Sequence, residues 1–276
     1  MKRKTKDLLF YGALLLGVGL LLLLEWKKGV FLSQEPYGRM VYDTVSRFFA
    51  AVICIVLLCR FSLSHLFAPT KPWLRPFLVI LPCFAIAINN FPFLSVFLGD
   101  AALGSYITDY VVYGLLCLSV GLFEEVAFRG CVFTVALERI PKIESAPLRV
   151  FVACVLSSAL FGLVHLTNLL AGASVGYVIL QVGYSFLIGS MCAIIMVKTS
   201  NIWYGILLHA IYNFAGGIVP EFGHGRIWTV PTIVWTAVVS VIVACYVVYL
   251  LFHIRAEEIE RLLKGKRYKQ SESAST

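Results

Sequence analysis

The chain has 276 residues, of which 60% are hydrophobic and only 14% are charged, with a formal net charge of +8. Its mean hydropathy of +0.88 excludes a soluble globular domain. The basic residues gather in short clusters beside apolar runs, where anionic lipid headgroups and membrane topology account for them. We therefore predict an integral cell membrane protein that contacts membrane lipids, and we expect no nucleic-acid partner.

Apolar runs long enough to cross a hydrocarbon core about 30 Å thick recur along the whole chain. They predict an all-α fold, a polytopic transmembrane helix bundle of about eight spans, forming a single integral membrane domain over residues 1–276. The expected spans are residues 8–24, 41–61, 74–90, 108–126, 148–166, 175–198, 202–217 and 229–252.

Loop charges predict the topology of these spans. Most Lys and Arg residues lie in the N-terminus, in segments 60–75 and 129–149, and in the tail beyond Arg255, whereas segments 91–107 and 167–174 contain none. Because basic loops stay on the cytoplasmic side, both termini are expected in the cytoplasm. We expect residues 129–147 to form a cytoplasmic amphipathic connection that contains a short helix.

The fourth expected span ends in two acids followed by a basic residue. Glu125 and Arg129 are four positions apart, which places them on one face of an α-helix, whereas Glu124 points about 100° away. We therefore expect Arg129 to neutralise Glu125 and leave Glu124 free to accept a proton from water. A Glu–Arg pair at this spacing is also common as a purely structural ion pair.

Two further polar patterns fall in later spans. Phe161 and His165 end the fifth span, and His209 and Asn213 lie four positions apart in the seventh, where an imidazole and an amide can donate hydrogen bonds to one oxyanion. Taken alone, a buried His is more often structural than catalytic, and Phe161 is expected to serve packing. Together, however, polar groups in three otherwise apolar spans predict one shared site.

These three patterns resemble the CPBP intramembrane protease family, which includes type II CAAX prenyl endoproteases, bacteriocin-processing enzymes and Abi proteins. The family's E-E-x-x-x-R is matched by Glu124, Glu125 and Arg129, its F-x-x-x-H by Phe161 and His165, and its H-x-x-x-N/D by His209 and Asn213. The resemblance covers residues 108–217, which would form the catalytic core.

The resemblance implies hydrolysis of a peptide bond within the membrane, in a membrane-associated peptide or a lipidated protein. Glu124 would activate water, with His165 holding that water. His209 and Asn213 would stabilise the oxyanion. Glu125 and Arg129 would support the site by fixing the helix end.

The resemblance leaves the cofactor, the host and the substrate open. Glu124, His165 and His209 are alternative ligands for Zn²⁺, but they do not form an H-E-x-x-H helix, so we favour a mechanism without a metal cofactor. A prenylated substrate requires a host that prenylates, and in a eukaryote the protein would lie in the ER membrane. Bacterial leader peptides or pheromones are the alternative substrates.

Two other classes of function fit intramembrane Glu and His residues. One is a transporter or proton relay, and the other is a non-catalytic membrane scaffold. The chain has no internal repeat and no Pro or Gly flanking the acids, which argues against the transporter.

Overall fold

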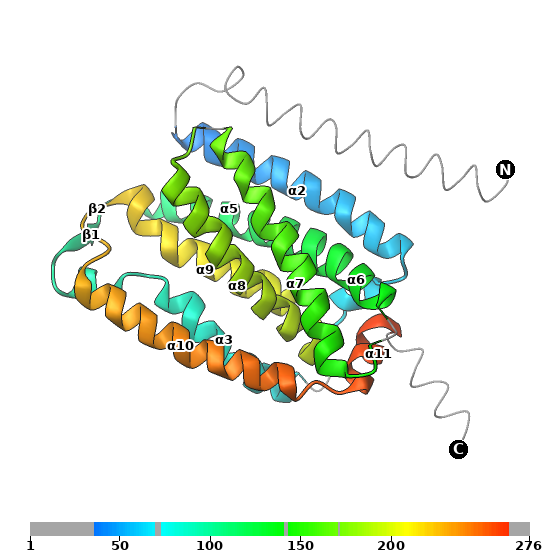
Figure 1. Ribbon diagram of the computed structural model, residues 1–276. Helices are drawn as coiled ribbons and strands as arrows, with labels where there is room; N and C mark the ends of the chain where they lie inside the picture. Colours follow the sequence, from blue (N-terminus) through cyan, green and yellow to red (C-terminus); the bar gives the residue numbers. More distant parts are fainter. Residues whose placement is uncertain (1–35, 70–72, 141–142, 171, 265–276) are drawn as a thin grey trace.

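The computed structural model describes residues 36–69, 73–140, 143–170 and 172–264; the predicted first span, residues 8–24, lies outside the described residues. The described chain is a helix bundle with one small sheet (Figure 1). Its elements in chain order are α2 (Pro36–Arg60), η1 (Ser64–Phe67), α3 (Leu74–Asn89), α4 (Phe93–Phe97), β1 (Ala101–Leu103), α5 (Ile107–Glu125), the π-helix η2 (Val126–Phe133), α6 (Thr134–Arg139), α7 (Ala146–Val164), η3 (His165–Leu169), α8 (Val175–Thr199), α9 (Trp203–Phe222), β2 (Gly223–Gly225), α10 (Val230–Phe252) and α11 (Ala256–Lys264).

Each expected span from residue 41 onward coincides with a helix of the bundle. Not all of these helices satisfy the length and hydropathy of a membrane span. α3 has only 16 residues, and α9 carries the polar His209 and Asn213, which lower its hydropathy. The all-α membrane bundle is confirmed for the described residues, but the count of eight spans is not. Within that part, the helical stretches able to cross a membrane number 5: Tyr37–Arg60, Ile107–Arg139, Ala146–Leu169, Val175–Thr199 and Val230–Phe252.

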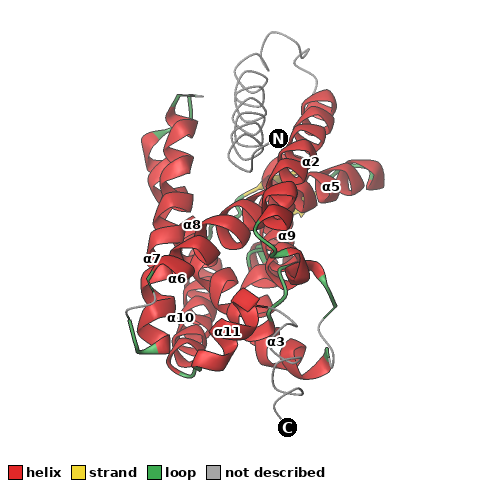
Figure 2. Cartoon of the chain, turned by 90° about the vertical axis from the view of Figure 1, so that its right-hand side faces the viewer, coloured by secondary structure: helices red, strands yellow, loops and turns green. Residues whose placement is uncertain are grey.

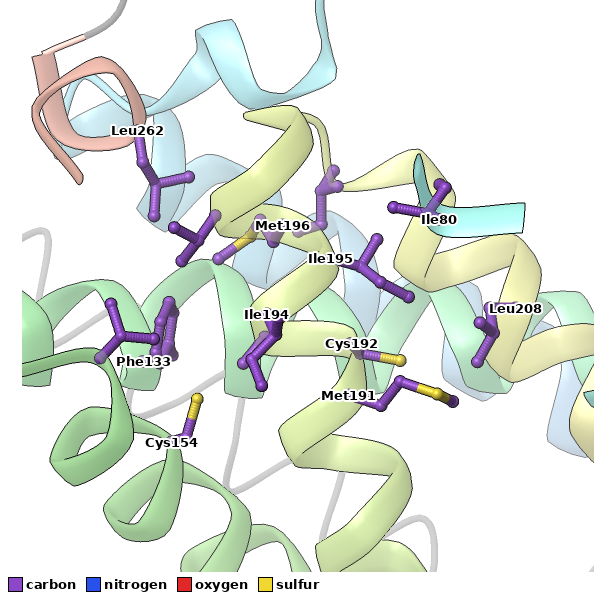
Figure 3. Packing of buried hydrophobic residues seen from close by; sticks show 14 of the residues in the cluster. Ile80, Phe133, Cys154, Met191, Cys192, Ile194, Ile195, Met196, Leu208 and Leu262 are labelled. Atoms are coloured by element: carbon purple, nitrogen blue, oxygen red, sulfur yellow. The ribbon is translucent and has the colours of Figure 1, made fainter. Parts of the chain in front are cut away.

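α8 lies at the centre of the bundle. Residues 191–197 are buried without interruption, so this stretch of α8 has no lipid-facing side. Figure 3 shows Met191, Cys192 and the residues after them packed between side chains from several other elements, among them Phe133 and Leu208. Because α8 packs against several other helices, its side chains help to fix the positions of those helices.

A glycine brings α5 against α9. A Cβ added at Gly121 would lie 2.8 Å from the backbone oxygen of Ile206, so only glycine permits this approach. In Figure 2, α7 and α8 lie on one side and α2 and α5 on the other, with α9 between them. The end of α5, with its two acids, is thereby held beside the first turns of α9.

Residues 129–147 contain the expected short helix, α6, but the sequence prediction was wrong about where the fourth span ends. The helix does not end near residue 126 but continues as η2 and α6 to Arg139, so that Ile107–Arg139 is one stretch of 33 residues. The turns of η2 are π-helical, and the Phe128 carbonyl accepts a hydrogen bond from the Ser157 hydroxyl, 2.8 Å away on α7. This outside donor stabilises a backbone geometry that the hydrophobic pattern does not reveal.

A two-stranded antiparallel sheet interrupts the otherwise helical fold. β1 pairs with β2 in the register Ala101↔Gly225, where Gly225 has a φ of +98° that favours glycine. The pairing joins the segments that follow α4 and α9, at one end of the bundle.

The basic segments gather at the opposite end. The loop after α2 meets α11, where His65 Nε2 donates a hydrogen bond to the Leu262 carbonyl over 2.9 Å. A cavity of about 300 Å³ is lined by both of these segments and by α6. The residues after α2, the start of segment 129–149 and the tail helix α11 therefore share one end, which agrees with their grouping by charge.

Candidate active site

The three sequence motifs meet at one cavity of about 100 Å³. Its polar lining comes from α5, from the junction of α7 with η3, and from α8 and α9. A volume of this size holds about three water molecules at roughly 30 Å³ each. The lining residues are Val120, Glu124, Phe161, His165, Gln181, Tyr184, Ser185, Ile188, His209, Tyr212 and Asn213.

Glu125 is fully buried and contacts two side chains, Arg129 and His209. Its Oε1 lies 3.0 Å from Arg129 Nη1, as the spacing predicts. The same oxygen lies 2.8 Å from Nδ1 of His209 on α9. Because an ionised carboxylate can only accept hydrogen bonds, the Nδ1–H of His209 donates to Glu125. Glu125 therefore holds the His209 ring as well as pairing with Arg129, a contact that the motif spacing does not predict.

Glu124 is nearer to His209 than the sequence suggests. Its Oε2 lies 3.5 Å from His209 Nε2, so the two acids approach opposite nitrogens of one imidazole ring. The Glu124 side chain keeps 16% of its surface exposed, against 1% for Glu125. As expected, Glu125 is the carboxylate paired with Arg129 and Glu124 is the accessible one. Glu124 nevertheless has a close neighbour in His209.

Arg129 lies inside the bundle, which corrects its expected place at a helix end. Its side chain is 1% exposed, and its Nε donates a hydrogen bond to the Gly189 carbonyl over 3.1 Å. A Cβ at Gly189 would overlap the guanidinium group. The burial follows from the continuous helix, because η2 carries residue 129 into the space beside α8 rather than into a loop.

Phe161 contributes more than the packing expected from the sequence. Arg129 Cζ lies 4.3 Å from the centroid of its ring, a cation–π contact. The ring centroid is also 5.1 Å from that of His165 and 5.8 Å from that of His209, both edge-on. One aromatic ring thus supports the buried cation and both histidines of the motifs.

His165 and Asn213 also take their predicted place at the cavity. His165 is the residue at which α7 passes into η3, and its Nε2 is buried without a hydrogen-bond partner within the described residues. A buried polar atom without a partner costs free energy, so a cavity water or a substrate group is the natural partner for this nitrogen.

The wall that α8 contributes is missing from the sequence prediction. Gln181, Tyr184, Ser185 and Ile188 all line the cavity, and Gln181 Oε1 accepts a hydrogen bond from Asn168 Nδ2 over 2.7 Å. A signal for this wall does exist, because these positions follow the i, i+3, i+4, i+7 spacing of one helix face and three of the four are polar.

Sequence reasoning also misses Arg47. It lies in the middle of α2, where an ionisable residue of a membrane span is itself an indication of function. Its Cζ is 5.8 Å from the centroid of Phe123, the residue next to Glu124. A second cation therefore lies beside the helix turn that carries the two acids.

The alternative zinc site is not preformed among the described residues. A catalytic zinc takes three protein ligands. Among the residues that the structure describes, no group of three or more His, Cys, Asp or Glu side chains could hold a metal ion. Glu124 and His209 approach each other to 3.5 Å, and His165 lines the same cavity.

Residues 106–215 match the family model described as Rce1-like, type II CAAX prenyl endopeptidase. No curated protein and no solved structure matches the chain significantly. The matched segment runs from the start of α5 into α9 and contains all the motif residues described above. The match confirms the resemblance read from the motifs, and the helices that carry it are those of an integral membrane protein.

Proposed function

We propose that the chain is an intramembrane endopeptidase. The premise is its match to the type II CAAX prenyl endopeptidase family over residues 106–215. The chain hydrolyses a peptide bond of a membrane-associated peptide or a lipidated protein. The observation that carries the proposal is the cavity shared by Glu124, His165, His209 and Asn213. Polar groups inside apolar helices are costly, and a shared reaction explains their convergence.

In this proposal Glu124 is the general base. Its carboxylate is the accessible one of the two acids, and it lines a cavity with room for water. A water between Glu124 and the unpartnered His165 Nε2 gives its proton to Glu124 as its oxygen bonds to the scissile carbonyl carbon. When the C–N bond breaks, the proton passes from Glu124 to the leaving amine.

His209 and Asn213 stabilise the oxyanion of the tetrahedral intermediate. The amide of Asn213 donates from the same cavity wall as His209 Nε2, which donates when the ring carries both protons. Glu125 supports the protonated ring by accepting from Nδ1 over 2.8 Å. Arg129 in turn pairs with Glu125 over 3.0 Å, so the buried pair acts on the reaction through His209.

The cavity size bears on the substrate. About 100 Å³ accommodates a water and the atoms of a peptide group, but not a long lipid chain in addition. We therefore place the lipid or apolar part of the substrate in the bilayer beside the helices, with only the scissile peptide entering the cavity. Prenylated proteins remain one substrate class, and membrane-bound leader peptides remain another.

The basic end of the bundle, with α6 and α11, faces the cytoplasm in this proposal, with both termini on that side. In a eukaryotic host the membrane is that of the ER. A cysteine introduced by Ser275→Cys, in a background where exposed Cys59 and Cys245 are replaced, should react with an impermeant reagent only from the cytoplasmic side. Labelling only from outside would contradict this orientation.

The decisive experiment compares the wild-type protein with Glu124→Gln in proteoliposomes, using a farnesylated peptide and its unlipidated twin. Glutamine keeps the size of the side chain but cannot accept the proton, so cleavage should fall by at least about 100-fold with folding intact. Gly183→Ala is the matched control, because a Cβ there meets nothing within 4 Å. Cleavage by Glu124→Gln near the wild-type rate would exclude Glu124 as the base, and an absence of cleavage by the wild-type protein would leave transport or partner binding as the function.

Exhaustive chelation tests the proposal that no metal takes part. Activity should survive it, and elemental analysis of the pure enzyme should find no stoichiometric zinc. Loss of activity with a chelator and recovery on adding Zn²⁺ would instead assign Glu124, His165 and His209 to a metal that gathers them on binding.

A further inference from the structure

The part of α9 that follows Asn213 contains residues that weaken a helix. Gly216 and Gly217 lack the side chains that restrict a helical backbone, and Pro220 lies inside the helix. Proline has no N–H, so the Gly216 carbonyl has no partner at i+4. The turn that carries the Asn213 amide therefore needs support from outside the helix.

Asn90, at the end of α3, supplies one such support. Its Nδ2 donates a hydrogen bond to the Tyr212 carbonyl over 2.8 Å. The side chain occupies the space above Gly216, because a Cβ at that position would overlap Asn90 Nδ2. A backbone carbonyl has two lone pairs, so Tyr212 can accept from Asn90 while it keeps its bond within the helix.

Tyr113 of α5 supplies the other support, one residue further along. Its hydroxyl lies 3.4 Å from the Asn213 carbonyl and donates to it. A Cβ at Gly217 would overlap that hydroxyl. The Tyr113 ring is fixed in turn by α9, with its centroid 5.8 Å from Phe214 and 5.5 Å from Phe222.

We propose that Asn90 and Tyr113 are positioning residues that set the rotation and height of the α9 turn bearing Asn213, and that Gly216 and Gly217 admit them. This inference rests on the proposed function, since it assumes that the Asn213 amide donates to the oxyanion. Neither residue lines the cavity, so each acts through Asn213 and touches no reacting atom.

Asn90→Ala and Tyr113→Phe test the inference in the full-length protein in proteoliposomes. Each should lower kcat by about 10-fold, while KM stays within about twofold. The loss is smaller than the roughly 100-fold that a 1 Å misplacement of a catalytic group can cost. Gly216→Ala should reproduce Asn90→Ala by displacing the same side chain. Gly176→Ala, where a Cβ meets nothing within 4 Å, should retain wild-type kcat.

A double-mutant cycle separates positioning from general damage to the fold. In an Asn213→Ala background, Asn90→Ala and Tyr113→Phe should cause no further loss of kcat, because the amide they position is gone. If their effects instead add to that of Asn213→Ala, the positioning role is overturned while the proposed function stands. If Asn213→Ala alone leaves kcat unchanged, the oxyanion role fails and the positioning role falls with it. Tyr113→Phe removes a single oxygen, so it remains informative should Asn90→Ala not fold.

Discussion

α8 and α10 look alike in sequence and differ in their place in the molecule. Both are long apolar helices, with hydropathies of 2.0 and 2.4, yet 50% of the apolar window of α8 is buried inside the protein against 11% for α10. α8 supplies a cavity wall and the carbonyl that receives Arg129, whereas α10 lies along the outside of the bundle (Figure 1). Lipid and protein interior are equally apolar, so hydropathy cannot distinguish a central helix from a peripheral one.

The largest effect should come from removing the cation that α8 receives. Arg129→Ala leaves the buried Glu125 with only the His209 contact, and breaking a buried pair in this way typically costs about 3–5 kcal/mol. We expect lower abundance, a lower thermal midpoint in detergent and lower activity. Lysine should substitute poorly, since an ammonium cannot span Glu125 and the Gly189 carbonyl as a guanidinium does.

A normal thermal midpoint with activity abolished would contradict this account of Arg129. It would mean that the guanidinium acts on the reaction and not on the stability of Glu125.

A smaller effect is expected at the glycine that faces this cation. Gly189→Ala places a methyl group where the guanidinium lies, and overpacking of a core typically costs about 1–3 kcal/mol. Gly183→Ala in the same helix meets open space and should be neutral or stabilising, because alanine restricts the unfolded chain more than glycine does. Thermal unfolding of the two variants side by side measures the difference. Equal thermal stability of the two variants would show that the Arg129 guanidinium is not packed tightly against Gly189.

On α10 the expected effect is smaller again. Tyr246 donates a hydrogen bond to the Val79 carbonyl of α3 over 2.6 Å, which is the polar link between these two helices. Tyr246→Phe removes only that oxygen and should cost about 1 kcal/mol in unfolding experiments, with kcat unchanged. A fall in kcat would place α10 closer to the chemistry than its outer position suggests.

The smallest effect should appear on the outer face of α10. Ile242 is 64% exposed in the bundle, where lipid would cover it. Ile242→Leu keeps the apolar volume, so both the thermal midpoint and cleavage should match the wild type. If this variant loses activity, the face contacts a substrate or a partner and α10 is not a passive outer helix.

The local parts of this architecture could be predicted from the sequence. The helices α2, α3, α5, α7, α8, α9 and α10 overlap the expected spans, because a span depends on the composition of its own residues. The contact between Glu125 and Arg129 was predictable for the same reason, since the two residues share one helix turn. The gathering of the three motifs at one cavity was predicted from the cost of polar groups in lipid.

Contacts between distant helices could not be read from local patterns. The contact of Glu125 with His209 joins residues 84 positions apart, and the bond from Arg129 to Gly189 joins residues 60 positions apart. The π-helical turns of η2, the central place of α8 and the support that Phe161 gives to Arg129 depend on the same kind of packing. Hydropathy and motif spacing thus determined the membrane class and the polar residues to consider. Only the tertiary structure decided which of them meet, because a helix in an apolar surrounding takes its orientation from the shapes of its neighbours and not from its own hydrophobicity.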